Sequence, residues 1–561
     1  MINPSTRESA DSVPSPDERW WHGAVVYENH LPSLRDGNGD GIGDLEGLIE
    51  SLDYLSDVLG VDAVWVGPFY RSPLLDGGYD VVDHCAVEPR FGDLATFDRL
   101  VEEAHRRGLR VLVDYIPNHT SHVHPWFIES RSSRDNARHD WYVWRDPAPG
   151  GGLPNNWTSE AGGSVWEWDP GRAQYYLHSH LIEQPDLNWR NPHVRAAMLD
   201  VLRFWLERGA DGFRVDVAHM LMKHPDLPDN PPADDASGNP FDLQHPDYAS
   251  QLHIHDRRHP DTGEALAEIR RVLDEFPHTV AIAEIEAMPW EEWAGYYGHG
   301  GTGIHLPFPF RIIETSWAAP DLARELRDMY LALPDGCWPI VALGNHDRSR
   351  LASRLGQSQA RVAAMLLLTL RATPCLFYGD ELGYEDQPVA IDRQRDYFAR
   401  AAGGVSRDPV RTPMAWNDGH NGGFSPASAD CTWLPIAADY ATRNVEVQLH
   451  DSDSLLTLYR DLLILRAQLP ALRFGAIELI DTGTAGLLDS PVVAYRRTLH
   501  KSSLTIVLNL TSSEQPAPPG VGGRLVFSTH PDERGTSLAP GAPIQPDRGL
   551  ILQVDLKRET R

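Results

Sequence analysis

The sequence predicts an α/β protein built on a closed (β/α)8 barrel, with an excursion domain after the third strand and a C-terminal antiparallel β domain. Short β-branched runs alternate with longer amphipathic stretches, and this alternation predicts a parallel sheet with crossover helices. Seven clear strands and an eighth expected near residues 303–306 favour a closed barrel. After residue 475 the pattern changes to short alternating strands, which are typical of a small antiparallel domain.

The expected strands and helices follow one another along the chain. The strands are AVVYE (24–28), DAVWVG (62–67), RVLVDY (110–115), GFRVDV (212–217), TVAIAE (279–284), PIVALG (339–344) and PCLFYG (374–379). The clearest helices between them are LATFDRLVEEAHRRG (94–108) and HVRAAMLDVLRFWLERG (193–209).

The length of 561 residues exceeds what one hydrophobic core supports, so two or three domains are expected. We place the barrel in residues 19–117 and 186–474, excursion domain B in 118–185, and a β-sandwich in 475–561. Residues 1–18, a polar stretch rich in Ser and Pro, are expected to form a disordered tail. Residues 220–262 are rich in Pro, Asp and His and are interpreted as a lid.

The formal net charge of −30 argues against nucleic acid and anionic membranes as partners and favours neutral substrates. The 17 Trp residues would suit the apolar faces of sugar rings, although Trp also fills large cores. The four cysteines are scattered without a CxxC pair, so neither a disulfide framework nor a zinc site is expected. The N-terminus has no apolar signal core, and the longest apolar run, 362–370, is too short to span a bilayer. A cytoplasmic protein is therefore expected.

Acidic residues stand where four of the expected strands end. Asp114, Asp216 and Glu284 close three of them, and Asp347 follows a fourth. The active site of a barrel enzyme lies at the carboxyl ends of its strands, so these acids are expected to meet at one mouth. Because an unpaired carboxylate is costly to bury, any one of them alone would be explained by a structural pairing. The four together indicate a catalytic site.

Two carboxylates at a mouth rich in Trp, Tyr and His favour glycoside hydrolysis, in which one acid attacks as an anion and the other donates a proton. Arg214 lies two residues before Asp216, so both side chains face the same way and the guanidinium can keep this carboxylate ionised. Glu284 follows the apolar run VAIA, where burial favours the protonated acid. Glu286, two residues further on the same side, is the alternative acid.

Several motifs resemble the α-amylase superfamily, glycoside hydrolase family 13, and within it the oligo-1,6-glucosidase and α-glucosidase branch. The similarity runs from about residue 20 to residue 416. The motifs are DYIPNHTS (114–121), QPDLNW (184–189), GFRVDV (212–217), AIAEI (281–285) and GNHD (344–347). The resemblance implies that Asp216 is the nucleophile and Glu284 the general acid/base of a retaining enzyme. It also implies that Asp347 holds the 2- and 3-hydroxyls of the bound sugar.

The same resemblance implies further substrate contacts. His119 and His346 should contact the bound sugar ring, and Arg214 should be a substrate-binding residue as well. Asp76 and Tyr79, in DGGYD, resemble the pocket floor of an exo-acting enzyme. The residue similar to the floor's pairing arginine is Arg407, in SRDPVRTPMAW. A floor of this kind would admit a single glucose unit at the non-reducing end.

The segment DGNGDGIGD (36–44) offers oxygen ligands at alternating positions between glycines. This spacing suits Ca²⁺, or less well Mg²⁺, and it resembles the calcium loop of this branch. The expected ligands are Asp36, Asn38, Asp40, the Ile42 carbonyl and Asp44. The alternative is a solvated acidic turn. The role of the ion should be structural, because the loop holds none of the site acids.

The chain departs from the family pattern in two places. The first strand continues as YENHLPSLRDG (27–37), and Ala283 stands where Gly is usual. His219 and His224 flank the nucleophile strand and are interpreted as structural parts of the pocket or lid. A transglucosylase, a trehalose synthase and a non-enzymatic binding relative stay open as alternatives. The expected partners are short α-glucosides, with the chain as a monomer or homodimer.

Two cues to linkage conflict. Val217, directly after the nucleophile, resembles enzymes that accept α-1,6 bonds, whereas the following residues 218–220 resemble α-glucosidases active on maltose. We therefore expect an exo-acting enzyme that cleaves α-1,4 bonds in short oligosaccharides, has measurable α-1,6 activity and acts poorly on starch. An oligo-1,6-glucosidase is the alternative.

Overall fold

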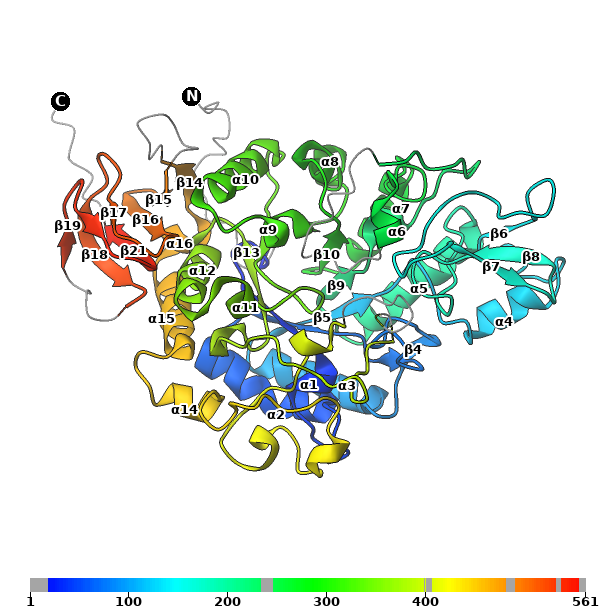
Figure 1. The fold of residues 1–561 in the computed structure, drawn as a ribbon, viewed down its shortest axis with the longest axis horizontal. Coiled ribbons are helices and arrows are strands. Elements are labelled where there is room, and N and C mark those ends of the chain that lie inside the picture. The colour runs from blue at the N-terminus through cyan, green and yellow to red at the C-terminus, as the bar shows by residue number, and fades with distance from the viewer. Residues whose placement is uncertain are drawn as a thin grey trace.

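The structure is a computed structural model that describes residues 19–233, 246–397, 399, 406–480, 490–530 and 536–553. The expected tail, 1–18, lies outside these ranges. The centre of the molecule is an eight-stranded sheet in which every pairing is parallel, in the order β11-β10-β9-β5-β2-β1-β13-β12. Its end strands, β11 and β12, lie against each other. The predicted barrel is confirmed (Figure 1).

The eight barrel strands lie close to their expected positions. They are β1 (Val26–Asn29), β2 (Ala63–Val66), β5 (Arg110–Tyr115), β9 (Gly212–Val215), β10 (Val280–Ile285), β11 (Leu306–Pro309), β12 (Ile340–Ala342) and β13 (Thr373–Phe377). The eighth begins where the expected segment, 303–306, ends, because the chain first turns through the glycines at 298, 300, 301 and 303.

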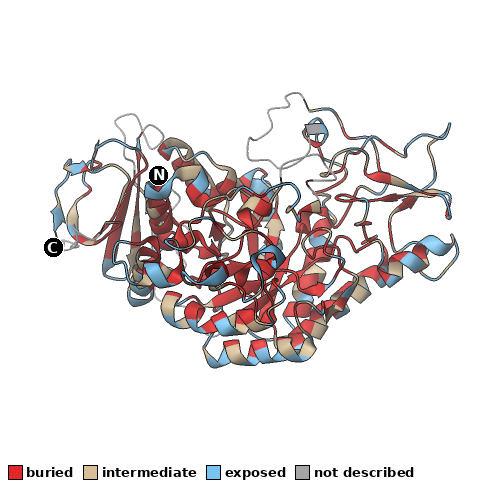
Figure 2. Cartoon of the chain, turned by 60° about the horizontal axis from the view of Figure 1, so that its bottom comes forward, coloured by how far each residue is buried: buried red, intermediate tan, exposed pale blue. Residues whose placement is uncertain are grey.

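Helices surround this sheet with their apolar stripes facing inward (Figure 2). α3 (Leu94–Arg106) begins where the side chain of Asp93 accepts from the Thr96 N–H, and it buries Phe97, Leu100, Val101 and Ala104, a helical spacing. The other long helices around the barrel are α2 (Leu45–Asp53), α5 (Pro192–Glu207), α7 (Thr262–Leu273), α10 (Ala319–Ala332) and α12 (Gln357–Thr369). Shorter ones are α1 (Leu31–Leu34), α8 (Trp290–Gly295), α9 (Phe310–Glu314) and α11 (Leu351–Leu355).

Two long connections rise from the barrel's rim. The first, between β5 and β9, holds α4 (Pro125–Ser132) and a small antiparallel sheet of β6 (Trp144–Arg145), β8 (Gln174–Leu177) and β7 (Trp166–Asp169). The second follows β9 and includes α6 (Pro246–Ala249). Trp157 donates to the Pro228 carbonyl at 2.8 Å and Asn155 to the Leu227 carbonyl at 3.0 Å. These bonds fasten the two connections to each other.

The C-terminal part packs against the barrel through α12, α15 (Leu455–Gln468) and α16 (Pro470–Phe474), at the end of the molecule away from β6–β8 (Figure 1). Its six-stranded antiparallel sheet has the order β14-β15-β16-β21-β18-β19. The strands are β14 (Ala476–Leu479), β15 (Val492–Leu499), β16 (Ser502–Asn509), β18 (Gly523–Ser528), β19 (Ser537–Leu538) and β21 (Arg548–Gln553). A separate pair joins β17 (Gln515–Pro516) and β20 (Pro543–Ile544). None of the helices that the structure describes is long and apolar enough to cross a bilayer.

Candidate active site

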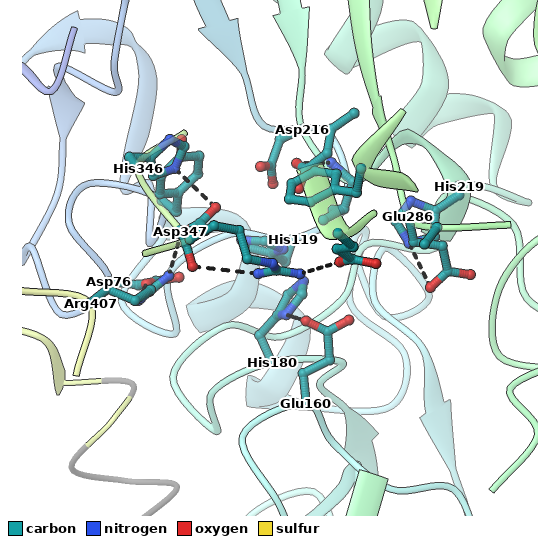
Figure 3. Close-up of a pocket in the computed structure, with 17 residues that line it drawn as sticks. Asp76, His119, Glu160, His180, Asp216, His219, Glu286, His346, Asp347 and Arg407 are labelled. Carbon is teal, nitrogen blue, oxygen red and sulfur yellow. Dashed lines mark hydrogen bonds and ion pairs between the residues drawn. The ribbon is translucent and has the colours of Figure 1, made fainter. Parts of the chain in front are cut away.

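A pocket of about 250 Å³ opens at the carboxyl ends of the barrel strands, between the barrel and its two long connections (Figure 3). This volume lies just below the roughly 300–1,000 Å³ common for small-molecule sites, which favours a small ligand. All the expected substrate and catalytic residues except Arg214, which lies behind the surface, line this pocket. The lining residues include Asp76, Tyr79, His119, Asp216, Glu284, His346, Asp347 and Arg407.

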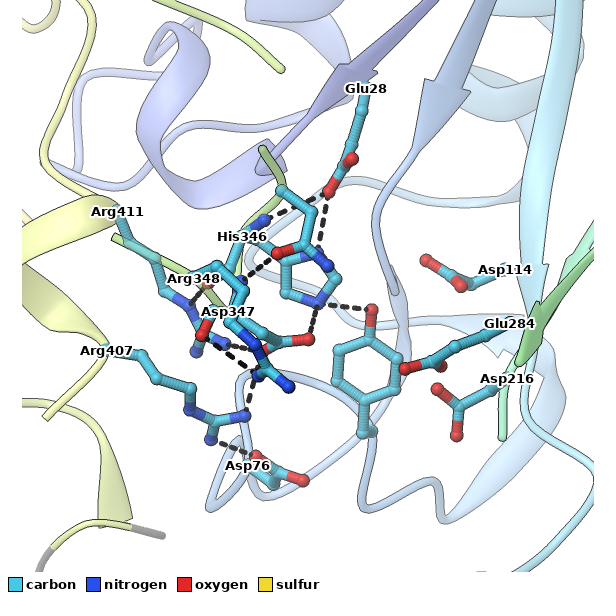
Figure 4. Close-up of polar contacts among 12 residues, drawn as sticks. Glu28, Asp76, Asp114, Asp216, Glu284, His346, Asp347, Arg348, Arg407 and Arg411 are labelled. Carbon is cyan, nitrogen blue, oxygen red and sulfur yellow. Dashed lines mark hydrogen bonds and ion pairs between the residues drawn. The ribbon is translucent and has the colours of Figure 1, made fainter. Parts of the chain in front are cut away.

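Arg214 joins three of the strand-end acids. Its Nη1 lies 2.9 Å from Asp114 and 2.6 Å from Asp216, and its Nη2 donates to Glu284. Figure 4 shows these three carboxylates together on one side of the site. The guanidinium is almost completely buried, so its single charge faces three carboxyl groups in a region of low polarity.

Burial raises the pKa of two of the acids around Arg214. Burial raises the pKa of Asp114 to about 6. Burial also raises the pKa of Asp216 well above its usual range, and this outweighs the opposing effect of Arg214. From the sequence we expected that Arg214 can keep Asp216 ionised. It lowers the pKa as expected, but burial acts more strongly in the other direction, and Glu284 and Asp114 add smaller contributions of the same sign as burial. The titration therefore belongs to the cluster as a whole.

His346 is held between the first strand and the pocket. Its Nδ1 lies 2.7 Å from Oε1 of Glu28, a fully buried acid on β1, and its Nε2 lies 3.0 Å from the hydroxyl of Tyr79. The Tyr79 ring stacks on the imidazole with centroids 5.6 Å apart. Burial lowers the pKa of His346 to about 3, so the ring is neutral. The first strand thus reaches the pocket through Glu28.

The floor of the pocket is an ion-pair network. Arg407 Nη2 lies 2.6 Å from Asp76 and 2.9 Å from Asp396, and Arg407 Nη1 lies 3.1 Å from Asp347. Arg411 contacts Asp347 as well, at 2.8 Å. Burial opposes ionisation, but His346, Arg407 and Arg411 lower the pKa of Asp347 well below its usual range. The predicted partnership of Arg407 with Asp76 is present, and it closes this end of the pocket (Figure 4).

The QPDLNW segment has a clear structural role. Gln184 donates to Asp76 at 2.9 Å, and its Nε2 lies 3.2 Å from Nε2 of His119. Asp186 forms an ion pair of 2.6 Å with Lys223, from the second connection. This motif therefore holds one floor acid and one expected substrate-binding histidine in place.

A second ion pair lines the wall contributed by the first connection. His180 Nδ1 lies 3.3 Å from Glu160 Oε2. Although burial opposes it, Glu160 raises the pKa of His180 to about 9, so this imidazole is protonated at neutral pH. The two residues lie below the acids in Figure 3.

Glu286, the alternative acid, has different surroundings from Glu284. It lies 2.8 Å from Arg257, 3.2 Å from Arg258 and 3.5 Å from the Nε2 of His219. Burial opposes ionisation, but Arg257, His219 and Arg258 lower the pKa of Glu286. An ionised carboxylate cannot donate a proton, so Glu286 does not suit the role of general acid.

The loop 36–44 lies outside the pocket. Asp36 accepts four hydrogen bonds, from the N–H groups of Asn38, Gly39 and Gly41 and from the Ser425 hydroxyl. Asp44 accepts three, from the N–H groups of Gly37, Asn38 and Gly47. A carboxylate has about four acceptor positions, so Asp44 keeps one for a cation, whereas Asp36 would have to exchange a hydrogen bond for a metal contact. The oxygen donor set fits Ca²⁺ chemically. Within the described ranges, no three His, Cys, Asp or Glu side chains are arranged to hold a metal ion. Calcium at this loop stays a prediction.

Comparison with known proteins identifies the family. The family model described as "Alpha amylase, catalytic domain" matches residues 31–475. The chain belongs to the α-amylase family. A second model, a domain of unknown function (DUF3459), matches residues 481–544 of this family member. The resemblance seen in the sequence motifs is confirmed, and the protein is a glycoside hydrolase.

Relatives of this α-amylase family member include enzymes that act on α-glucosides. A "Probable alpha-glucosidase" of Rhizobium meliloti is 43% identical over 494 residues, which cover 85% of this chain and 87% of the relative. An "Oligo-1,6-glucosidase" of Parageobacillus thermoglucosidasius is 34% identical over 537 residues, with 88% and 90% covered.

Solved structures of a glucosyl transfer enzyme and a trehalulose synthase are also similar. The alpha-glucosyl transfer enzyme XgtA aligns with a TM-score of 0.85 at 37% identity, covering 95% of this chain and 99% of the other. The trehalulose synthase MutB aligns with a TM-score of 0.85 at 31% identity, covering 95% and 100%.

Several residues in the pocket or in contact with its lining were not predicted from the sequence. Glu28 follows the same strand-end rule as the other acids and could have been found by it. The signals for the remaining ones are weak, because they come from irregular connections or, for Phe310 and Glu314, from the two ends of the short helix α9. These residues are Glu160, His180, Phe310, Glu314, Arg348 and Asp396.

Proposed function

We propose that this enzyme is a retaining, exo-acting α-glucosidase that releases glucose from the non-reducing end of short α-glucosides. The observation that carries the proposal is the shared guanidinium of Arg214. It holds Asp216 and Glu284 at one point of a pocket that is closed by an ion pair at one end. A retaining mechanism requires two carboxyl groups that face one anomeric carbon and carry one proton between them.

In the proposed mechanism, the proton shared by the two carboxyl groups lies on Glu284 and leaves Asp216 ionised. Asp216 attacks the anomeric carbon while Glu284 donates this proton to the glycosidic oxygen. The leaving group departs and a covalent glucosyl-enzyme forms. Glu284, now ionised, takes a proton from water, which attacks the same carbon and releases α-glucose. Arg214 offsets the charge of the two carboxylates throughout. Ionised Asp347 accepts hydrogen bonds from ring hydroxyls as positive charge develops on the sugar.

The test is the effect of Asp216→Asn and Glu284→Gln. Each is expected to lower kcat by several orders of magnitude with unchanged circular dichroism, because the nucleophile or the acid/base is lost. Glu291→Gln, an exposed acid on the nearby α8, is the matched control. Proton NMR of the wild-type reaction should show α-glucose first. Initial release of β-glucose would refute the retaining assignment.

Transfer of the glucosyl unit to a sugar is the second candidate activity, supported by the similarity to XgtA and MutB. Both activities pass through the same covalent intermediate, and only the acceptor differs. Product analysis with maltose, isomaltose, sucrose and trehalose separates them. The cytoplasmic location, the monomeric or homodimeric state and the bound Ca²⁺ stay predictions.

A further inference from the structure

Glu28 is a buried acid that the proposed hydrolytic steps do not use. It lies near the carboxyl end of β1 and is only 1% exposed. It contributes no surface to the pocket, but its side chain reaches His346, which does line the pocket (Figure 4). A buried polar group that contacts a site residue from behind, without touching the site itself, indicates a supporting role.

The two oxygens of the Glu28 carboxyl group have different surroundings. Oε1 lies 2.7 Å from Nδ1 of His346 and accepts from the backbone N–H of the same residue at 3.2 Å. Oε2 has no hydrogen-bond partner among the residues that the structure describes. An ionised carboxylate has about four acceptor positions and is costly to bury without partners. This geometry therefore favours an uncharged carboxylic acid.

The charges around Glu28 favour the same state. The titratable groups that face it from other strands are Asp114 on β5, Arg214 on β9, Asp347 after β12 and the Cys375 thiol on β13. Arg214 is already the partner of three other carboxyl groups. Burial raises the pKa of Glu28 well above its usual range against the opposing effect of Arg214, and Asp347 and Asp114 raise it further.

We propose that Glu28 is a positioning residue that holds the His346 imidazole in place as an uncharged carboxylic acid. The inference rests on the proposed α-glucosidase activity and specifies how one of its expected sugar-binding residues is oriented. His346 meets the pocket through Nε2, which lies 3.0 Å from the Tyr79 hydroxyl and 3.3 Å from Asp347. The other ring nitrogen, Nδ1, is held from behind by Glu28.

Aromatic rings complete the setting of His346. Tyr79 stacks on the imidazole, and the Trp65 ring meets it edge-on with centroids 6.1 Å apart. These contacts restrict the tilt of the imidazole ring, and the contact at Nδ1 restricts its movement within the ring plane. Glu28 thus fixes the one direction that the aromatic neighbours leave open.

The uncharged state of Glu28 matters for the electrostatics of the site. An ionised Glu28 would compete for the charge of Arg214, which faces Asp216 and Glu284, and it would favour a protonated His346. An uncharged Glu28 avoids both effects. Because burial also lowers the pKa of His346 to about 3, the pair carries no charge at neutral pH. The histidine is therefore oriented without any change in the charge around the catalytic acids.

The first test replaces Glu28 by two side chains of similar size. Glu28→Gln is uncharged and its amide can form a hydrogen bond to the imidazole, so kcat/KM on maltose should stay within about threefold of the wild type. Glu28→Met leaves Nδ1 of His346 unpaired, so kcat/KM should fall about 10- to 100-fold. A loss in Glu28→Gln as large as that in Glu28→Met would overturn the uncharged state. Full activity of Glu28→Met would overturn the positioning role.

A neighbouring variant separates positioning from folding. Tyr27 points to the opposite face of β1, where its hydroxyl donates to Glu381 at 2.7 Å. Tyr27→Phe should lower the melting temperature but keep the wild-type kcat/KM on maltose. If Tyr27→Phe lost as much kcat/KM as Glu28→Met, the loss would come from the strand, and the positioning role would be wrong.

Infrared spectroscopy in heavy water measures the state of Glu28 without catalysis. At neutral pH, the difference spectrum between the wild type and Glu28→Gln should contain the C=O band of an uncharged carboxylic acid. A difference spectrum with carboxylate bands alone would overturn the inference. Failure of the proposed function is a separate result. A wild type that cleaves no α-glucoside would refute the α-glucosidase assignment, and the infrared comparison would still show whether Glu28 is uncharged.

Discussion

Val217, the residue after Asp216, has a left-handed backbone with φ 34° and ψ 46°. This conformation is rare for a β-branched residue and costs on the order of 1–3 kcal/mol, so it is normally found where function requires it. Here it points the Val217 N–H at Oε2 of Glu284, 3.2 Å away. The strained turn thus links the expected nucleophile to the expected acid/base, and it places the valine side chain in the pocket wall.

The first prediction at this scale concerns linkage. Val217→Thr has nearly the same shape and the same β-branched strain, so it changes only the polarity beside the scissile bond. We expect the kcat/KM ratio of maltose to isomaltose to rise about tenfold, since one contact contributes only about 1–3 kcal/mol to discrimination. Val447→Thr, on an exposed helix, is the control. An unaltered ratio would mean that this residue does not set linkage, and soluble starch as the best substrate would contradict the closed pocket.

The second prediction concerns the His180–Glu160 pair. The folded-state pKa of His180, about 9, lies above the unfolded value near 6.5. Its stabilisation is therefore fully present below about pH 6.5 and is lost as the pH rises through about 9. At pH 6, the free energy of unfolding of His180→Gln should be lower than that of the wild type by on the order of 1–3 kcal/mol. Its melting temperature should be lower as well. The difference should shrink at pH 10. If the difference in free energy of unfolding between wild type and His180→Gln did not change with pH, the His180 imidazole would not be protonated in the folded protein.

At the scale of the elements, regular structure was predictable because hydrophobic periodicity directly reports burial. The strand patterns located β5, β9 and β10 within a few residues, and the strand-end rule then located Asp114, Asp216 and Glu284. The wall formed by Glu160, Arg257 and Glu286 was not predictable. These residues are brought together by irregular connections, whose paths depend on tertiary contacts such as the Trp157–Pro228 hydrogen bond. The direction of the Asp216 pKa shift also depends on full burial by several segments, which no local pattern reveals.

The loop 36–44 carries the third prediction. We expect one Ca²⁺ ion at oxygens of Asp36, Asn38, Asp40 and Asp44, about 2.3–2.6 Å away. The ion should stabilise the fold, because Asp44 also caps α2. EGTA should lower the melting temperature of the wild type and Ca²⁺ should restore it. Asp40→Ala removes one exposed ligand but leaves the Asp44 cap of α2 intact, so EGTA and Ca²⁺ should change its melting temperature less than that of the wild type. A wild type that is insensitive to both EGTA and EDTA would argue against any metal here.

At the scale of the whole molecule, the C-terminal sheet and the barrel share one hydrophobic core. Tyr495, Ile506 and Ile551 belong to the same buried cluster as the barrel helices. Arg497, fully buried on β15, donates to the carbonyls of Thr369 and Gly475. A continuous core predicts that the two parts unfold together rather than in separate steps.

The fourth prediction follows from this shared core. Arg497→Met leaves the Thr369 and Gly475 carbonyls without their donor, and it should lower the free energy of unfolding by about 2–4 kcal/mol. Scanning calorimetry should show a single transition at a lower temperature. Arg496→Met, the neighbouring arginine on the exposed face of the strand, should have little effect. Two resolved transitions in the wild type would contradict a common core.

The ion pairs of Arg407 with Asp76 and Asp396 close one end of the pocket, so we expect substrate and products to pass through the opposite end, one after another. The leaving group must depart before water reaches the glucosyl-enzyme, and glucose must depart before another chain end can enter. Free glucose should therefore be a competitive inhibitor. A longer chain cannot slide forward after each cut, so it has to dissociate and bind again. Trimming of longer chains should therefore be distributive, and intermediates of every length should accumulate during a digest.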